Sequence, residues 1–376
     1  MLVVGAGFAG SVMAERIASR LGLRVLVVDR RDHVGGNAHD HLDDAGIRVH
    51  RHGPHLFHTN SERVVRYLSR FTEWQPYEHR VVASVGDRFV PFPINADTIE
   101  QLYGLALDET AMERFLAERA EPRERVSNGE DVVVGRVGRE LYETFFRGYS
   151  RKLWARDPSR LAATVTGRIP VRTNRDGRYF TDWHQALPRD GYTATFERML
   201  DHPNIEVRLS VCFEDVRDEV GFRHLVYTGP IDDFYGRRFG ALPYRSLRFE
   251  WERAETPGGA FVQPVAQVNY PDEERPFTRT TEFRHLYGQR VEVSTIAREF
   301  PSAEGEPYYP IPAPENQALY RRYERLAAAD EGVIFVGRLA RYQYLNMDQV
   351  VAQALATFRR SAATLAALPR RAAAVR

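Results

Sequence analysis

The stretch LVVGAGFAG, residues 2–10, decides the fold of this chain. A short apolar strand leads into a loop in which Gly5, Gly7 and Gly10 have the spacing G-x-G-x-x-G, and a helical pattern then continues to about Leu21. Such glycines let the backbone approach a pyrophosphate at the N-terminus of the helix, where free N–H groups favour anions. The sequence therefore predicts a dinucleotide-binding unit at residues 2–29.

The segment after this helix points to the kind of dinucleotide. Residues 24–28 form a second apolar strand, and Asp29 closes it, about 20 residues after the last glycine of the loop. An acid at this place accepts hydrogen bonds from ribose hydroxyls. The basic link from Arg30 to Asn37 contains Gly35-Gly36 and resembles the second half of the FAD fingerprint in glutathione-reductase-like flavoproteins. We therefore expect FAD rather than NAD.

A late segment completes the expected cofactor domain. Residues 333–338 read as a buried strand ending in glycine, and a loop and a helix from about Gln349 to Leu365 follow. In such flavoproteins a unit of this kind brings a helix N-terminus against the isoalloxazine. The Rossmann-like domain is therefore predicted to be discontinuous and to use both ends of the chain.

The middle of the chain has a different pattern. Residues 97–160 have the apolar spacing of helices, with Asp97 or Thr98 as the first cap, and residues 80–92 read as a hairpin. Alternating stretches within 236–300 predict an antiparallel sheet. We therefore expect an α/β protein in which a helical bundle and an antiparallel β-sheet domain are inserted into a discontinuous Rossmann-like FAD-binding domain. The expected boundaries are 1–75, 187–235 and 328–376 for the FAD domain, 97–160 for the bundle, and 76–96, 161–186 and 236–327 for the sheet domain.

Composition excludes several classes of function. The net charge of +1 does not favour nucleic-acid binding, and no apolar run approaches the ~18 residues of a membrane span. The N-terminus does not resemble a signal peptide, and Cys212 is the only cysteine, so neither an internal disulfide nor a cysteine-based metal cluster is expected. Lys152 is the only lysine, so arginine must hold any anionic substrate. We expect a cytoplasmic protein.

Several rarer motifs occur along the chain. They are GPHLFHTN at 53–60, FFRGYSRKLW at 145–154, RIPVR at 168–172, YTGPID at 227–232, YYP at 308–310, GRL at 337–339 and NMD at 346–348. Together they resemble the bacterial UDP-galactopyranose mutase family. The resemblance runs from the first glycines to about residue 360.

The resemblance implies an activity. The family interconverts UDP-galactopyranose and UDP-galactofuranose and uses FAD in its reduced form. Flavin N5 attacks the anomeric carbon and expels UDP, and the flavin–sugar iminium opens the ring, which a different hydroxyl then recloses. Family members are often dimeric, so a homodimer is implied, and the furanose product would serve a cell-surface glycan or a natural product.

The resemblance also implies roles for particular residues. Arg168 and Arg279 match the diphosphate-binding arginines, and His58 matches a histidine close to the flavin and the sugar. These three are the expected catalytic residues, and no metal is expected. The expected substrate-binding residues are His79, Phe145, Phe146, Tyr149, Ser150, Trp154, Tyr179, Asn269, Tyr309 and Tyr344. The expected cofactor-binding residues are Gly5, Gly7, Phe8, Ala9, Gly10, Asp29, Arg30, Gly36, Asn37, His55, Leu56, Arg338, Leu345, Asn346, Met347 and Asp348. A mobile lid is implied near 165–180.

Some positions depart from the family pattern and leave alternatives open. His52, Ala96, His184 and Leu345 replace residues that the family usually carries. The same mechanism could therefore act on another sugar nucleotide, such as UDP-N-acetylgalactosamine or a dTDP-deoxyhexose like dTDP-fucose. Two other classes also remain: an FAD oxidoreductase of the amine-oxidase type and a non-catalytic protein that binds sugar nucleotides.

Overall fold

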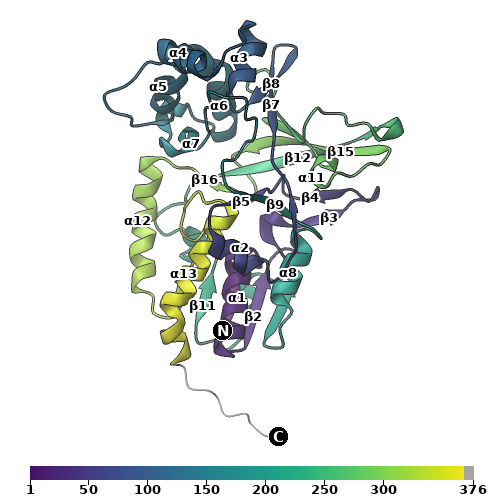
Figure 1. The fold of residues 1–376 in the computed structure, drawn as a ribbon. Helices are drawn as coiled ribbons and strands as arrows, with labels where there is room; N and C mark the ends of the chain where they lie inside the picture. The colour runs from purple at the N-terminus through teal and green to yellow at the C-terminus, as the bar shows by residue number, and fades with distance from the viewer. Residues whose placement is uncertain (368–376) are drawn as a thin grey trace, which may run out of the picture.

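The computed structural model describes residues 1–367, so the end of the expected FAD domain, residues 368–376, lies outside this part. Figure 1 shows a parallel sheet with its helices in the lower half, a group of helices at the top, and a second sheet that extends to one side. The expected α/β class with a Rossmann-like domain is confirmed.

The lower sheet has five parallel strands in the order β10-β2-β1-β11-β17. Its strands are β1 (Leu2–Val4), β2 (Val25–Asp29), β10 (Ile205–Leu209), β11 (Leu225–Tyr227) and β17 (Val333–Phe335). The central strands are apolar runs, as parallel strands covered on both faces require. Because the strands come from three distant stretches, both the early and the late parts of the chain build this sheet.

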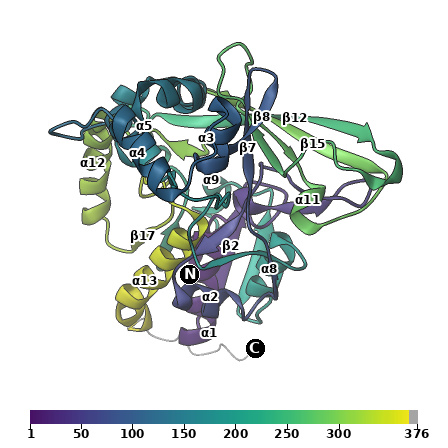
Figure 2. The ribbon, with the colours of Figure 1, turned by 45° about the horizontal axis from the view of Figure 1, so that its top comes forward.

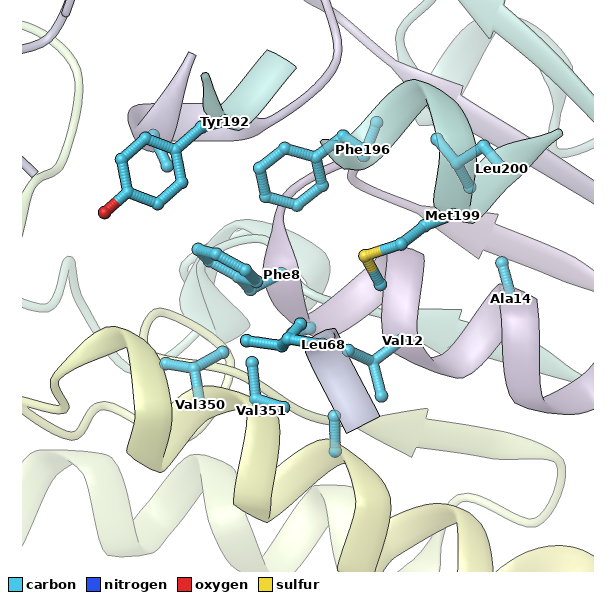
Figure 3. Close-up of a cluster of buried hydrophobic side chains, with 14 of the residues drawn as sticks. Phe8, Val12, Ala14, Leu68, Tyr192, Phe196, Met199, Leu200, Val350 and Val351 are labelled. Atoms are coloured by element: carbon cyan, nitrogen blue, oxygen red, sulfur yellow. The ribbon is translucent and has the colours of Figure 1, made fainter. Parts of the chain in front are cut away.

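Three helices pack together against this sheet. They are α1 (Phe8–Leu21), α8 (Tyr192–Leu200) and α13 (Met347–Ala366). In Figure 3, Phe8 and Val12 of α1 face Phe196 of α8 and Val350 of α13, and the centroids of the Phe8 and Phe196 rings are 4.6 Å apart. Each such side chain contributes about 1.5–3 kcal/mol by leaving water. This packing fixes the positions at which α1 and α13 begin.

The upper helices form the expected bundle. They are α3 (Ala96–Tyr103), α4 (Glu109–Arg119), α5 (Gly129–Tyr142), a π-helical turn (Glu143–Arg147), α6 (Gly148–Trp154) and α7 (Thr164–Gly167). The expected cap of the first helix is wrong. Asn95 is the cap, because its Oδ1 accepts from the Thr98 N–H at 3.1 Å while its own N–H donates to Thr98 Oγ1 at 3.0 Å. Asp97 and Thr98 lie inside the first turn.

The second sheet has seven strands in the order β16-β12-β15-β14-β13-β7-β8. They are β7 (Val81–Val85), β8 (Arg88–Phe92), β12 (Tyr244–Glu255), β13 (Gln267–Asn269), β14 (Arg279–Glu282), β15 (Val293–Ser302) and β16 (Tyr309–Pro310). The sheet is antiparallel except for one pair, β13 and β7, which run parallel. Figure 2 shows β12 and β15 extending away from α4 and α5.

The only lysine joins the bundle to this sheet. Lys152 Nζ donates to the carbonyl oxygens of Tyr270, Arg275 and Phe277 at 2.7, 3.1 and 2.9 Å. Burial lowers the pKa of Lys152 to about 8. Gly148 allows the close approach, since a Cβ there would lie 2.2 Å from the carbonyl oxygen of Pro271. Lys152 therefore has a structural role, holding α6 against the loop that precedes β14.

A small sheet lies between the two large ones. Its order is β5 (Phe57–Thr59), β9 (His184–Pro188) and β6 (Trp74–Pro76), all antiparallel. A further hairpin pairs β3 (Asp40–Leu42) with β4 (Arg48–His50). In Figure 1, β5 and β9 lie between the parallel sheet and the upper helices. The small sheet thus places His58 between the two parts of the molecule.

Candidate active site

A cavity lies at the carboxyl ends of the parallel strands, where dinucleotides bind in folds of this kind. The expected cofactor residues that line it are Gly5, Gly7, Phe8, Ala9, Asp29, Arg30, Gly36, Asn37, His55, Arg338 and Met347. The lining also includes residues that were not among the expected cofactor-binding residues, for example Arg31, Cys212, Thr228 and Tyr308.

The other expected cofactor residues support the cavity without lining it. Leu56 and Leu345 pack against the main hydrophobic core. Asn346 caps α13, and its N–H donates to Gln349 Oε1 at 2.9 Å. Asp348 Oδ2 accepts from Thr59 Oγ1 at 2.8 Å, which ties the start of α13 to β5.

The glycine loop leaves no room for side chains. A Cβ at Gly10 would lie 1.8 Å from the Gly5 carbonyl oxygen, and a Cβ at Gly5, where φ is +103°, would lie 2.0 Å from Thr228 Oγ1. The side chain of Phe8 packs into the core (Figure 3), so only its backbone is free for a ligand. The first turn of α1 therefore presents backbone N–H groups to the cavity, which suits a pyrophosphate.

Asp29 binds the backbone of the glycine loop and of the segment that follows β2. Its Oδ2 accepts from the Ala6 N–H at 2.7 Å, and its Oδ1 accepts from the Arg31 N–H at 3.0 Å. A carboxylate has about four lone-pair sites, so both oxygens keep acceptor capacity for ribose hydroxyls. The residues of the cavity therefore fit an adenine dinucleotide.

Arg338 connects the cavity to a second group of residues. Its guanidinium donates to the carbonyl oxygens of Leu345, at 2.5 and 3.1 Å, and of Tyr308, at 3.2 Å. Its Cζ lies 5.5 Å from the ring centroid of Tyr309 and 5.9 Å from that of Tyr344. Arg338 thus lies between the cavity and a second group, which we call the arginine–tyrosine cluster. This cluster comprises Tyr149, Trp154, Arg168, Tyr179, Arg279, Tyr309 and Tyr344.

Arg168 lies over an aromatic wall. Its Nη2 donates to the Tyr344 hydroxyl at 2.5 Å, and its Cζ lies 4.3 Å from the centroid of that ring. Tyr344 contacts Trp154 and Tyr309 edge to face, with centroids 5.4 Å apart in both pairs. Arg168 itself is exposed and has no acidic partner among the described residues. Its charge is therefore free to meet an anion.

Arg279 has a carboxylate partner. On adjacent strands, Arg279 faces Glu299, and its Nη2 and Nε lie 2.8 and 2.9 Å from Glu299 Oε2. Burial alone would lower the pKa of Arg279, but the Glu299 carboxylate raises it well above its usual value. The pair therefore keeps a charged guanidinium in a largely enclosed place.

The phenols of Tyr149, Tyr179 and Tyr309 have raised pKa values and remain protonated at neutral pH. Burial raises the pKa of Tyr309 to about 12, with a further increase from Glu299 and an opposing effect of Arg279. Burial also raises the pKa values of Tyr149 and Tyr179, although the nearby arginines oppose it. These hydroxyls can therefore donate hydrogen bonds to a diphosphate.

His58 and His79 flank the same aromatic ring. The Phe180 ring stacks on His58 with centroids 3.7 Å apart, and it also lies 6.1 Å from His79. Burial lowers the pKa of His79 to about 3, so this imidazole is neutral. His79 also contacts Tyr179 edge to face at 5.8 Å. The two histidines therefore adjoin the arginine–tyrosine cluster.

Besides His79 and Trp154, four other expected substrate residues are buried. Phe145 and Phe146 lie in the core of the bundle, each 5.7 Å from the Phe92 ring. Ser150 is also buried, and Asn269 Oδ1 accepts from Gln267 Nε2 at 2.8 Å. Their contacts with a substrate stay a prediction.

Sequence reasoning missed Phe180, Asp182 and Glu299. Asp182 Oδ2 lies 2.7 Å from His58 Nδ1, and Glu299 pairs with Arg279 as described above. Both acids were found only through strand pairing and loop geometry. The one local signal was the run Tyr179 to Asp182, where two aromatic residues and an acid precede β9.

Residues 1–367 lack two features that would suggest other functions. No helix there is long and apolar enough to cross a membrane. No group of three or more His, Cys, Asp or Glu side chains in that part could hold a metal ion.

Known proteins are similar to this chain over most of its length. A family model described as UDP-galactopyranose mutase matches residues 144–344, and one described as an NAD(P)-binding Rossmann-like domain matches 3–71. A probable UDP-galactopyranose mutase of Klebsiella pneumoniae is 38% identical over 95% of this chain and 93% of its own. A dTDP-fucopyranose mutase of Escherichia coli is 35% identical over 94% and 96%. A crystal structure of reduced UDP-galactopyranose mutase shares the fold, with a TM-score of 0.76 at 17% identity over 98% and 96% of the two chains.

Proposed function

The chain belongs to the UDP-galactopyranose mutase family, and on this premise we propose that it interconverts UDP-galactopyranose and UDP-galactofuranose. One observation carries the proposal: a dinucleotide cavity adjoins a cluster of two arginines and four tyrosines, and Arg338 connects the two. An oxidoreductase of the amine-oxidase type would need the cavity but has no use for the cluster.

The cofactor that we propose is FAD in its reduced form. The backbone at Gly5 to Gly10 would hold the pyrophosphate, Asp29 the ribose, and the start of α13 the isoalloxazine end. When bound and reduced, FAD supplies the nucleophile that takes the sugar from its diphosphate while the ring changes size. His55, which burial keeps neutral by lowering its pKa to about 3, adds no charge to this end of the cavity.

The arginine–tyrosine cluster would hold the substrate through its diphosphate. The UDP that leaves must be kept for recapture, and fixed cations with hydroxyl donors do this while the negative charge develops. Arg168 and Arg279 supply the charge, and Tyr149, Tyr179, Tyr309 and Tyr344 supply the hydroxyls. The Trp154 ring packs against the rings of Tyr309 and Tyr344 and would hold them in place.

We also propose that residues 165–180 close over the substrate. The far end of this segment is anchored, because the Tyr179 N–H donates to the His79 carbonyl at 2.7 Å. The near end, around Gly167 and Arg168, has no comparable tie to the sheet among the described residues. Closure there would bring Arg168 onto the diphosphate and exclude water from the reacting sugar.

A second candidate is a mutase for a dTDP-deoxyhexose. The Escherichia coli relative named dTDP-fucopyranose mutase supports it at 35% identity. His52, whose Nδ1 lies 2.9 Å from the Tyr308 hydroxyl, and Ala96, His184 and Leu345 are the departures that could accompany such a change. Direct comparison of the two substrates decides between the candidates.

The deciding experiment uses purified protein with dithionite under nitrogen. UDP-galactofuranose is added, and the pyranose form is followed by chromatography, with dTDP-fucofuranose in parallel. Conversion that disappears when the cofactor is reoxidised supports a mutase that needs reduced FAD. Much faster turnover of the dTDP sugar would move the assignment to the second candidate. A folded yellow protein that converts neither sugar would refute both.

We further propose a homodimer that works in the cytoplasm. A reducing compartment suits an exposed free cysteine such as Cys212. Light scattering on the purified protein tests the dimer, which a mass near 43.2 kDa would contradict.

Gly10→Ala should abolish cofactor retention. The new Cβ would lie 1.8 Å from the Gly5 carbonyl oxygen, so the loop must shift away from the start of α1. We expect purified Gly10→Ala to carry less than about a tenth of the flavin of the wild type, measured by the ratio of absorbance at the flavin and protein bands. Gly221→Ala is the matched control, because a Cβ there meets nothing within 4 Å. Full flavin content in Gly10→Ala would contradict the assignment of this loop.

The only cysteine provides an independent probe of the cavity. Cys212 is exposed and lines the cavity, so a bound FAD should hinder its reaction with a thiol reagent. We expect alkylation to be at least about tenfold slower in the FAD-loaded protein than in the apoprotein. The control is denatured protein, in which both samples should react alike. Equal rates in the folded samples would show that the cofactor does not reach Cys212.

A further inference from the structure

His58 lies where the cofactor cavity meets the substrate side. It is the central residue of β5, and its neighbour Thr59 donates to Asp348 at the start of α13. His55, three residues earlier, lines the cavity. On its other side, His58 stacks on Phe180, and the Phe180 ring in turn contacts His79 and Tyr179. The orientation and protonation of this imidazole therefore affect the binding of both the cofactor and the sugar nucleotide.

Asp182 determines which nitrogen of His58 carries the proton. Asp182 Oδ2 lies 2.7 Å from His58 Nδ1, and the two side chains are only 20% and 13% exposed. An ionised carboxylate can only accept hydrogen bonds, so Nδ1 must carry a hydrogen. In the neutral ring, Nε2 is then the acceptor. Within residues 1–367 the only hydrogen bond of the His58 ring is this one, made by Nδ1, so the Nε2 lone pair is free for a ligand.

Neighbouring contacts hold the His58 and Asp182 side chains in this arrangement. The Phe180 ring lies nearly parallel to the imidazole, at 12°, and restricts its rotation. Gln185, which pairs with His58 across β5 and β9, donates through Nε2 to the carbonyl oxygens of Asp182 at 2.9 Å and Phe180 at 3.4 Å. The Trp183 N–H donates to Asn60 Oδ1 at 3.0 Å. Both flanks of Asp182 are thus fixed to the small sheet.

We infer that Asp182 is a positioning residue that keeps the proton of His58 on Nδ1 and leaves Nε2 as a hydrogen-bond acceptor for the ligands. An acceptor at this place can bind a sugar hydroxyl or a cofactor N–H, whereas an N–H there could only donate to the hydroxyl oxygen and would oppose the cofactor N–H. The inference rests on the proposed function for its effect on turnover, but the tautomer itself can be measured without activity.

The test uses the FAD-loaded protein with ¹⁵N-labelled histidine. Asp182→Asn keeps the shape, but its amide can donate to Nδ1 and so move the proton to Nε2. Asp182→Glu keeps the carboxylate. Asp190→Asn is the matched control, because Asp190 is an exposed partner of Arg198 outside the site. The His58 signals are identified by their loss in His58→Gln, and the ¹⁵N shifts report which nitrogen is protonated.

We expect Asp182→Asn to reverse the His58 tautomer and to lower kcat about tenfold to a hundredfold, with KM changed less than about twofold. Asp182→Glu should recover the wild-type tautomer and much of the turnover, and Asp190→Asn should match the wild type. An unchanged tautomer in Asp182→Asn, or a reversed tautomer with unchanged kcat, would overturn the inference. A wild type without mutase turnover would refute the proposed function, while the ¹⁵N shifts would still decide whether Asp182 sets the tautomer.

Discussion

Arg168→Ala lowers kcat/KM for the sugar nucleotide by about 10²- to 10³-fold, or about 3–4 kcal/mol, and leaves the stability of the protein nearly unchanged. The size follows from loss of a fixed cationic donor at a site where negative charge develops. Stability should hold because Arg168 is exposed and its side chain contacts Tyr344 without an acidic partner. Steady-state kinetics with the reduced enzyme and a thermal melt measure the two effects.

Two further variants sharpen this prediction. Arg168→Lys keeps the charge but loses the planar fork, so it should recover only part of the activity. Arg189→Ala removes an exposed arginine that pairs with Glu73 at the surface and should behave like the wild type. If Arg168→Ala raises KM alone and leaves kcat intact, Arg168 binds substrate and transition state equally, and its proposed role in stabilising the leaving diphosphate is wrong.

Arg279→Met is expected to lose both activity and stability. Glu299 is 3% exposed, and its Oε2 is paired with Arg279, so the variant leaves a carboxylate buried without its cation. Breaking a buried pair in this way costs about 3–5 kcal/mol of folding free energy. Denaturant unfolding measures this loss, and the same sample should show no detectable mutase turnover.

The double variant Arg279→Met/Glu299→Leu separates the two losses. Replacing both members of a buried ion pair by apolar residues of similar size is often neutral for stability. We therefore expect the double variant to regain most of the folding free energy and none of the activity. Recovery of activity along with stability would show that Arg279 serves the fold and does not hold the diphosphate.

The early part of the fold could be predicted because its signals are local. The glycine loop, the apolar strands and Asp29 lie within one short stretch, and the structure places them as expected around the cavity. The helical bundle and the hairpin β7–β8 also follow from periodicity. The cap at Asn95 was missed because Asp97 and Thr98, two and three residues further on, are also good capping residues.

The rest depends on contacts between distant parts of the chain. The parallel pairing of β13 with β7 cannot be read from either strand, because alternation looks the same in both directions. Glu299 meets Arg279 through strand register, and Asp182 meets His58 through the loop before β9. Neither acid belongs to a motif. The family resemblance thus indicated the arginines and tyrosines, while the partners that orient Arg279 and His58 became visible only in three dimensions.

The order of strands in the parallel sheet has a consequence for synthesis on the ribosome. β1 is made long before its neighbour β11, which begins at Leu225, and the cavity also needs Gly337, Arg338 and Met347. A nascent chain therefore carries an incomplete sheet, with exposed strand edges, until β17 and the start of α13 have been translated. Flavin can therefore bind only after these residues have been translated. Yellow colour would distinguish chains that contain them from shorter chains whose translation was interrupted.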